Sequence, residues 1–384
     1  MIIELHILQN FAPSNLNRDD TNSPKECEFG GYRRARISSQ CIKRSIRKYF
    51  KDNALLPPEA LAKRTKLLVD NLTDRLVNKG KEKEQAQNVV TKAVSSMGLA
   101  LKENQTQYLV FLGEMEFTKL ADLILNHWAE LAETKDDKGK KEKETTSLGK
   151  ELLKVLDGGK AADLALFGRM LADLPDKSRD AACQVAHAIS THKVGVEFDF
   201  YTAMDDLQPK EETGAGMMGT VEFNSACYYR YANIDVNQLK DNLLGKPREK
   251  ATADELKEAR ALAGKTVDAF IRAAVNAIPT GKQNSFAAQN PPSFIFAVGR
   301  DSGTWSLANA FASPVWVGDN GDLVQKSQDA LIDYWDKLVK VYGEKGIKAK
   351  PAVTLNASQL SGLDSVENLD MLIARINQTV EVDS

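Results

Sequence analysis

The chain has 384 residues, of which 42% are hydrophobic and 27% are charged. These proportions are typical of a soluble globular protein, and the length predicts two or three domains. The formal net charge is only −2, which excludes a protein that binds nucleic acid through its whole surface and confines any such binding to one face. No run of 18 apolar residues occurs, so we expect no membrane span.

Cysteine and histidine spacing argues against metal sites and disulfides. The cysteines at positions 27, 41, 183 and 227 form no CxxC pair, which fits the reducing cytoplasm in which we place the protein. The four histidines, His6, His127, His187 and His192, show no spacing for zinc or for a catalytic triad, and we interpret them as structural. No glycine-rich phosphate loop of the Walker type is present, and we predict no cofactor and no bound metal.

The chain begins with a strand and a loop. The opening MIIELHILQNF has no basic leader and contains Glu4 and His6. It therefore predicts a strand over 2–8 rather than a signal peptide. The following residues, up to about position 31, are rich in turn formers and predict a loop.

Residues 29–51 concentrate positive charge, with eight Lys or Arg and no Asp or Glu. The pattern predicts a short strand, a turn and an amphipathic helix capped by Ser38 or Ser39. Ile42, Ile46 and either Tyr49 or Phe50 would face a core. That arrangement turns the polar positions to solvent: Gln40, Lys43, Arg44, Arg47 and Lys48. We predict that this surface holds nucleic-acid phosphates, the alternative being an ordinary solvated helix flank.

The remaining elements predict an α+β fold. Residues 57–180 show helical periodicity and predict a helical insertion that contains a charged, low-complexity loop at 133–147. We expect a helix over 181–191, strands over 194–204 and 220–234, a long helix over 252–278, a strand over 293–299, and helices near 330–342 and 366–380. Without the insertion, the order is that of a ferredoxin-like fold, which RNA-recognition domains also use. Their aromatic RNP signature is absent.

Several longer motifs then point to a known family. They are LNRDD at 16–20, GGYRRARISSQCIKRSIR at 30–47, ALFGRM at 165–170, VAHAIS at 185–190, YTAMDDLQ at 201–208 and EFNSACYYRYANI at 222–234. Together they resemble the CasC family, the repeated backbone subunit of the type I-E CRISPR surveillance complex, Cascade. The resemblance runs in family order from residue 3 to about residue 315.

The resemblance implies a hand-like shape. A ferredoxin-like, or RRM-like, palm would comprise 1–56, 181–199 and 223–384 with the C-terminal helices, the helical fingers would comprise 57–180, and a thumb hairpin would comprise 200–222. Copies would polymerise as a helical filament along CRISPR RNA, beside other Cascade subunits. The guide bases would pair with target DNA in antiviral defence, so that the protein reads the RNA backbone while base pairing reads sequence.

The same resemblance assigns binding positions. It implies that Arg18, Ser38, Gln40, Lys43 and Arg47 bind the RNA backbone, and we add Arg34, Arg36, Ser39 and Arg44 of the basic segment as further RNA-binding residues. Residues at a flipped-out base would be Phe167, Met170, Tyr201 and Thr202, and Met218 would be an apolar residue near the thumb tip. Apolar and aromatic side chains suit this role because they can replace a lost stacking partner. The charged loop offers possible contacts to target DNA, namely Lys138, Lys140, Lys141 and Lys143, although a purely solvated loop explains them equally well.

Asp205 and Asp206 form a carboxylate pair beside the proposed RNA path. Neighbouring residues on a strand point to opposite faces, so these two are poorly placed to chelate one metal ion. We therefore predict a scaffold without enzymatic activity. The alternative is a metal-dependent ribonuclease on the same fold that cuts target RNA, and a third reading is a regulator that binds double-stranded DNA without any RNA.

Overall fold

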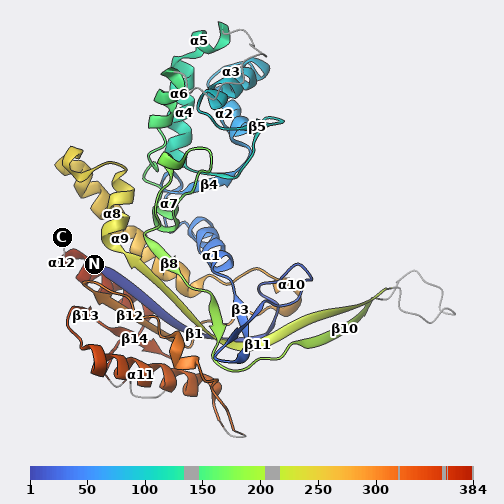
Figure 1. Cartoon of the computed structure of the whole chain (residues 1–384), viewed down its shortest axis with the longest axis vertical. Helices are drawn as coiled ribbons and strands as arrows, with labels where there is room; N and C mark the ends of the chain where they lie inside the picture. Colours follow the sequence, from blue (N-terminus) through green and yellow to red (C-terminus); the bar gives the residue numbers. More distant parts are fainter. Residues whose placement is uncertain (134–146, 204–216, 319–320, 357–359, 361, 383–384) are drawn as a thin grey trace, which may run out of the picture. The chain divides into compact units, whose positions relative to one another are not determined.

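The computed structural model describes residues 1–133, 147–203, 217–318, 321–356, 360 and 362–382. It divides into two compact units, each of which can be followed in Figure 1. Unit 1 comprises Met1–Phe50, Gln184–Asn233 and Asp268–Ser384, and unit 2 comprises Lys51–Cys183 and Ile234–Val267. Helices and strands are mixed, which confirms the α+β class. Unit 2 includes 234–267, a stretch that the sequence analysis placed in the palm.

Unit 1 is built on one mixed sheet. Its strands are β1 (Ile2–Ser14), β2 (Glu26–Phe29), β3 (Tyr32–Ile37), β8 (Cys183–Val185), β9 (Ala188–Ser190), β10 (Glu197–Ala203), β11 (Met217–Asp235), β12 (Phe294–Arg300), β13 (Ile347–Ala349), β14 (Pro351–Thr354) and β15 (Asp364–Ser365). The main path runs β15-β14-β12-β1-β11-β9-β3-β2. Strand β1 lies between β12 and β11, and it pairs antiparallel with β12 from Ile2↔Arg300 to Leu8↔Phe294.

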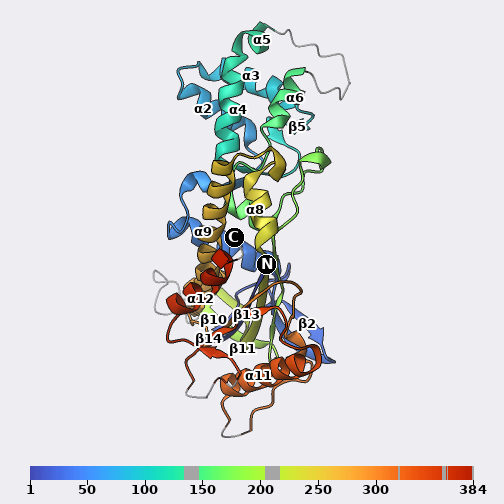
Figure 2. The ribbon, with the colours of Figure 1, turned by 90° about the vertical axis from the view of Figure 1, so that its left-hand side faces the viewer.

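Helices pack on both faces of this sheet. They are α1 (Ser39–Asp52), the C-terminal end of α9 (Ala253–Asn276), α10 (Gln283–Phe286), α11 (Leu323–Tyr342) and α12 (Leu369–Val382). Leu5 and Ile7 of β1 line a small cavity together with Ile42 and Ile46 of α1. Leu8, which lies on the other face of β1, belongs to an apolar cluster with residues of α11. Figure 2 shows α11 along the lower edge of unit 1. Because both faces are covered, β1 is buried over nearly its whole length, including its polar residues Glu4, His6 and Gln9.

The helix expected over 181–191 is wrong. This stretch forms the short strands β8 and β9. Ser190 pairs with Tyr228 and Ile189 with Tyr229 of β11, while Ile189 also faces Arg36 of β3. Strand β9 pairs with β11 on one side and with β3 on the other, so its backbone groups form hydrogen bonds on both sides. The stabilisation from this pairing outweighs the weak helical preference of the small residues.

Unit 2 is largely helical. It contains α2 (Leu68–Val77), α3 (Lys83–Ser96), α4 (Glu114–Asn126), α5 (Trp128–Glu133), α6 (Ser147–Lys154), α7 (Ala162–Phe167), α8 (Val236–Leu244) and the first part of α9, with the small strands β4 (Ala62–Thr65), β5 (Leu101–Lys102), β6 (Gln105–Thr106) and β7 (Val110–Gly113). Its core gathers apolar residues from α2, α3, α4 and α6. Within the described parts of both units, no helix is long and apolar enough to cross a membrane.

Glu4 and His6 of β1 belong to a buried polar network. Glu4 accepts hydrogen bonds from the Tyr231 hydroxyl at 2.7 Å and from the Arg300 guanidinium at 3.1 Å. Next to it, Nδ1 of His6 lies 2.9 Å from the Tyr229 hydroxyl. That hydroxyl accepts from the Leu307 N–H, so its own proton is available to Nδ1. Complete burial lowers the pKa of His6 to about 3, with a further contribution from the charge of Arg300.

We predict that His6 makes unit 1 sensitive to acid. The pKa of His6 is about 3 in the folded protein and about 6.5 in the unfolded chain. Between pH 3 and pH 6.5, on the order of these two pKa values, the unfolded chain therefore binds a proton at His6 that the folded protein does not bind. The free energy of unfolding therefore falls as pH is lowered through this window, by at most about 1.4 kcal/mol per pH unit. His6→Gln should remove this slope. Tryptophan fluorescence in urea reports it, because Trp305, Trp316 and Trp335 all lie in unit 1. Equal slopes in both proteins would contradict the prediction.

Candidate nucleic-acid interface

Helix α1 presents the basic surface expected from the sequence. Ile42, Ile46 and Phe50 are buried, as predicted, and they fix which side of the helix faces the core. The remaining positions are exposed or half-buried and include Gln40, Lys43, Arg44, Arg47 and Lys48. Residues three and four apart share one side of a helix, so these five form a single polar surface with four cationic side chains.

The N-terminus of α1 adds to this positive surface. Ser38 caps it: its Oγ accepts from the Cys41 N–H at 3.3 Å, and its own N–H donates to Oδ1 of Asn17 at 2.8 Å. Ser39, the first helical residue, is half-buried. The first turn, all of which is described, contains no acidic residue. The positive end of the helix dipole is therefore not neutralised within its own turn, which favours an anion there.

A polar pocket of about 310 Å³ lies beside this helix within unit 1. It brings together Arg18 and Arg44, which are both exposed. The other lining residues are Leu16, Asn17, Asp19, Asn22, Cys41, Ser45, Thr280 and Gly281. The carboxylate of Asp19 accepts hydrogen bonds within its own loop, from the Thr21 side chain and from the Ser23 and Thr21 N–H groups, and these lower its pKa. The lining contains two arginines and one carboxylate, so an excess of positive charge remains for an anion that enters the pocket.

Two of the predicted phosphate-binding arginines are engaged within the protein. Arg34 is fully buried, and its guanidinium donates to the Ser190 carbonyl at 3.1 Å and to the Phe311 carbonyl at 2.7 Å. Because its guanidinium is buried and bonded to these two carbonyls, the assignment of Arg34 as a surface contact is wrong. Arg36 is half-buried and lies 3.0 Å from Nδ1 of His187. Burial and then the charge of Arg36 lower the pKa of His187, as expected beside a basic surface.

Strands β10 and β11 form an antiparallel hairpin that extends from the sheet (Figure 1). Every residue of β10 is exposed. Thr202 pairs with Met218 and Phe200 with Thr220, so these side chains share one face with Phe198. Phe198, Phe200 and Met218 are 68%, 63% and 66% exposed. A hairpin face with this much exposed apolar surface indicates a binding site for a ligand or partner.

Tyr201 lies on the opposite face of this hairpin from Thr202. Its ring covers Gly219, where an added Cβ would lie 2.5 Å from Cζ and Oη of the tyrosine. The sequence analysis grouped Tyr201 with Thr202, whereas the strand geometry separates them. Thr202 and Met218 are brought together, and the exposed Phe198 and Phe200 were missed. The alternation in FDFYT was the available signal, but alternation alone does not distinguish an exposed face from a buried one.

Phe167 and Met170 belong to unit 2. Phe167 ends α7 and is half-buried, whereas Met170 is 84% exposed. The predicted contacts at Lys138, Lys140, Lys141 and Lys143 lie outside the described residues, as do Asp205 and Asp206.

Comparison with known proteins shows to which family this chain belongs. The profile of the CT1975-like protein family matches residues 3–377. The chain belongs to this family. One solved structure, titled "CRISPR RNA-guided surveillance complex, pre-nicking", contains a chain that is 28% identical, with a TM-score of 0.85 over 99% of this chain and 100% of that chain. The recognition of a CRISPR-complex subunit from the sequence motifs is therefore confirmed.

A second structure, titled "CRISPR RNA-guided surveillance complex", shares the fold. Its chain is 24% identical, with a TM-score of 0.72 and full coverage of both chains. No curated protein matches.

Some pocket residues of this family member lie far from the basic helix in sequence. Thr280 and Gly281 join Arg18 and Arg44 across more than 230 residues, and no local spacing could have indicated this. Gly281 sits so close to the loop after β1 that an added Cβ would lie 2.3 Å from the Leu16 carbonyl oxygen and 2.7 Å from that of Asn15. The close approach of two backbones requires glycine here.

We predict that Gly281→Ala destabilises unit 1 by about 1–3 kcal/mol, because the new methyl group must displace backbone atoms. Urea unfolding followed by tryptophan fluorescence measures the change. Gly195→Ala is the matched control, since an added Cβ there meets nothing within 4 Å. If both variants were equally stable, the close approach of the two loops would be wrong.

Proposed function

We propose that this chain is a non-catalytic backbone subunit of a type I-E Cascade complex that polymerises along CRISPR RNA. The guide bases would then be presented to target DNA, and neighbouring copies and other Cascade subunits would be its partners. The observation that carries the proposal is the basic surface of α1, with its unneutralised N-terminus, in a chain similar over its whole length to a component of an RNA-guided complex. Arg18 and Arg44, at the pocket beside it, extend the surface.

The proposal gives each part of the chain a role. Unit 1 would be a ferredoxin-like palm, in which β1, α1, β9, β11, the C-terminal end of α9 and β12 supply the strand–helix–strand–strand–helix–strand order, and its β10–β11 hairpin would be the thumb. Unit 2 would be the fingers. Cationic side chains would hold phosphates in register without reading sequence, while exposed apolar side chains such as Met218 would contact a displaced base.

Reversing charge on α1 tests the phosphate-binding surface. In Lys43→Glu/Arg47→Glu, the slope of log K against log salt for guide RNA should fall by about 2, one for each lost phosphate contact. Filter binding between about 50 and 200 mM salt measures this slope. The matched control is Lys337→Glu/Lys340→Glu on α11, which makes the same change in net charge elsewhere in unit 1. An unchanged slope in the α1 variant would refute this assignment.

The absence of catalysis is tested separately. We expect the assembled complex to leave a guide-matched RNA intact in the presence of Mg²⁺, with gel electrophoresis as the measurement. Cleavage that is lost in Asp205→Ala or Asp206→Ala would establish the ribonuclease alternative instead. Double-stranded DNA binding by protein that carries no RNA would establish the third reading.

A further inference from the structure

His187 lies at the end of the sheet where α1 begins. Strands β3 and β9 pair antiparallel, and their pairing ends at Ile37↔Ala188. Ser38 and His187 are the next residues along these two segments, so they lie across from each other at the end of the ladder. Ser38 caps α1, and His187 is exposed. The histidine is therefore placed beside the basic surface of unit 1, although its spacing in the sequence indicated only a structural role.

The imidazole of His187 is bound by Arg36. Nη1 of Arg36 lies 3.0 Å from Nδ1 of His187. A guanidinium has no acceptor, so Arg36 is the donor and Nδ1 carries no proton. The proton of the neutral ring is therefore on Nε2. In the part of the chain that the structure describes, no residue accepts a hydrogen bond from Nε2, so this N–H group remains for a ligand.

Arg36 retains further donors. Its Nε donates to the Glu26 carbonyl at 3.1 Å, and its Nη1 donates to His187. These are the side-chain hydrogen bonds that Arg36 makes to described residues, whereas a guanidinium carries five N–H groups. An acceptor with several oxygens can therefore bind Arg36 and His187 at the same time.

Lys25 joins this pair to the pocket beside α1. Its carbonyl accepts from the Arg36 N–H at 2.8 Å, and its own N–H donates to the Asn17 carbonyl at 2.9 Å. Asn17 lines the pocket, and its side chain also accepts from the N–H of the residue that caps α1. The cluster of Lys25, Arg36 and His187 therefore continues the cationic surface of unit 1 beyond the pocket.

The charges that act on His187 are positive. Burial lowers the pKa of His187 most, followed by the charges of Arg36 and Lys25. The Glu26 carboxylate on β2 is balanced by an ion pair with Arg33 at 2.9 Å. The first turn of α1 contains no acidic residue. An anion that enters beside His187 is therefore attracted by two cations.

The thiol of Cys27, on the strand next to β3, does not add a negative charge. Its pKa is raised, chiefly by burial. The thiol is therefore neutral near pH 7, on the order of two units below the ordinary thiol pKa, and it does not oppose an anion here.

We propose that His187 and Arg36 together bind one phosphate group of the guide RNA, and that His187 takes up a proton from solvent as the phosphate enters, an inference that rests on the proposed function. Once Nδ1 is protonated, it can no longer accept from Arg36, and two donors face each other. A phosphate group can accept from both donors, which removes this conflict. Its negative charge also favours the imidazolium over the neutral ring.

RNA binding and proton uptake are therefore coupled. Because the complex binds a proton that the free protein does not bind, the affinity for RNA rises as pH falls. The increase is at most about tenfold per pH unit for each such site.

Filter binding of guide RNA at constant salt between about pH 6 and pH 8 tests this coupling. In the unaltered protein, the dissociation constant should fall by roughly threefold or more as pH is lowered across this range. His187→Gln keeps an oxygen that can accept from Arg36 and an N–H that can donate to phosphate, but it cannot take up a proton. It should bind RNA about as tightly as the unaltered protein at the upper end of the range and lack the gain at the lower end.

His127→Gln is the matched control. It removes a histidine from unit 2, where His127 lies beside Glu130 and Glu151, and it should keep the pH dependence of the unaltered protein. Calorimetric titration with guide RNA in two buffers of different ionisation enthalpy measures the protons taken up on binding. The unaltered protein and His127→Gln should take up protons equally, and His187→Gln should take up fewer.

The outcomes are distinct. Equal pH dependence in His187→Gln and the unaltered protein, or RNA binding without proton uptake, would overturn the inference. A loss of affinity in His187→Gln that is the same at every pH would overturn it too, because His187 would then only orient Arg36. In all three cases RNA binding by α1 would still stand. Protein that retains no RNA at any pH would overturn the proposed function itself.

Discussion

Burial of one side of α1 against the sheet decides which side chains this helix exposes to solvent. Ile42, Ile46 and Phe50 are buried, and β1 supplies Leu5 and Ile7 to the same cavity. Apolar burial of this kind is worth about 1.5–3 kcal/mol per side chain, far more than a single surface charge contributes. The helix therefore cannot rotate to hide its cationic residues. The basic surface follows from packing and does not require any attraction between its like charges.

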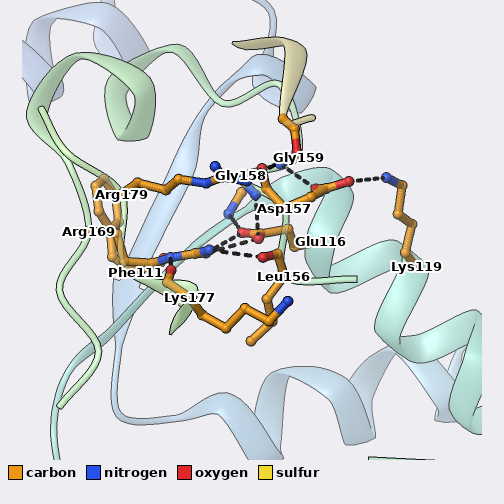
Figure 3. Close-up of polar contacts among 12 residues, drawn as sticks. Phe111, Glu116, Lys119, Leu156, Asp157, Gly158, Gly159, Arg169, Lys177 and Arg179 are labelled. Carbon is orange, nitrogen blue, oxygen red and sulfur yellow. Dashed lines mark hydrogen bonds and ion pairs between the residues drawn. The ribbon is translucent and has the colours of Figure 1, made fainter. Parts of the chain in front are cut away.

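Buried ionic groups give rigidity to both units. In unit 1, Glu4 and Arg300 form a pair that also holds Tyr231. In unit 2, Glu116 and Arg169 form a pair that also holds two loops (Figure 3). Isolated charges in such places would be strongly unfavourable, and each is balanced by a partner and by several hydrogen bonds. Directional bonds of this kind specify one arrangement of the surrounding backbone, where apolar packing alone would tolerate several.

Two groups of exposed apolar side chains lie on backbone with defined pairing or tight contacts. The hairpin face with Phe198, Phe200 and Met218 is fixed by the register of β10 and β11. Met170 follows a buried arginine and a constrained glycine. Rigid elements lose less entropy on binding than mobile loops do. In the proposed function, the cationic helix supplies affinity for the strand, and the apolar hairpin face divides its bases into groups.

The sequence by itself determined the α+β class, the buried and polar sides of α1, an N-cap at Ser38 or Ser39 and the long helices, because each depends on residues within a few positions of one another. The motifs also determined the family. Tertiary structure alone decided that Arg34 is buried, that 181–191 forms strands and that Thr280 and Gly281 reach the pocket beside Arg18. These features depend on pairing between segments up to hundreds of residues apart. Local pattern carries no information about which distant backbone a residue will meet.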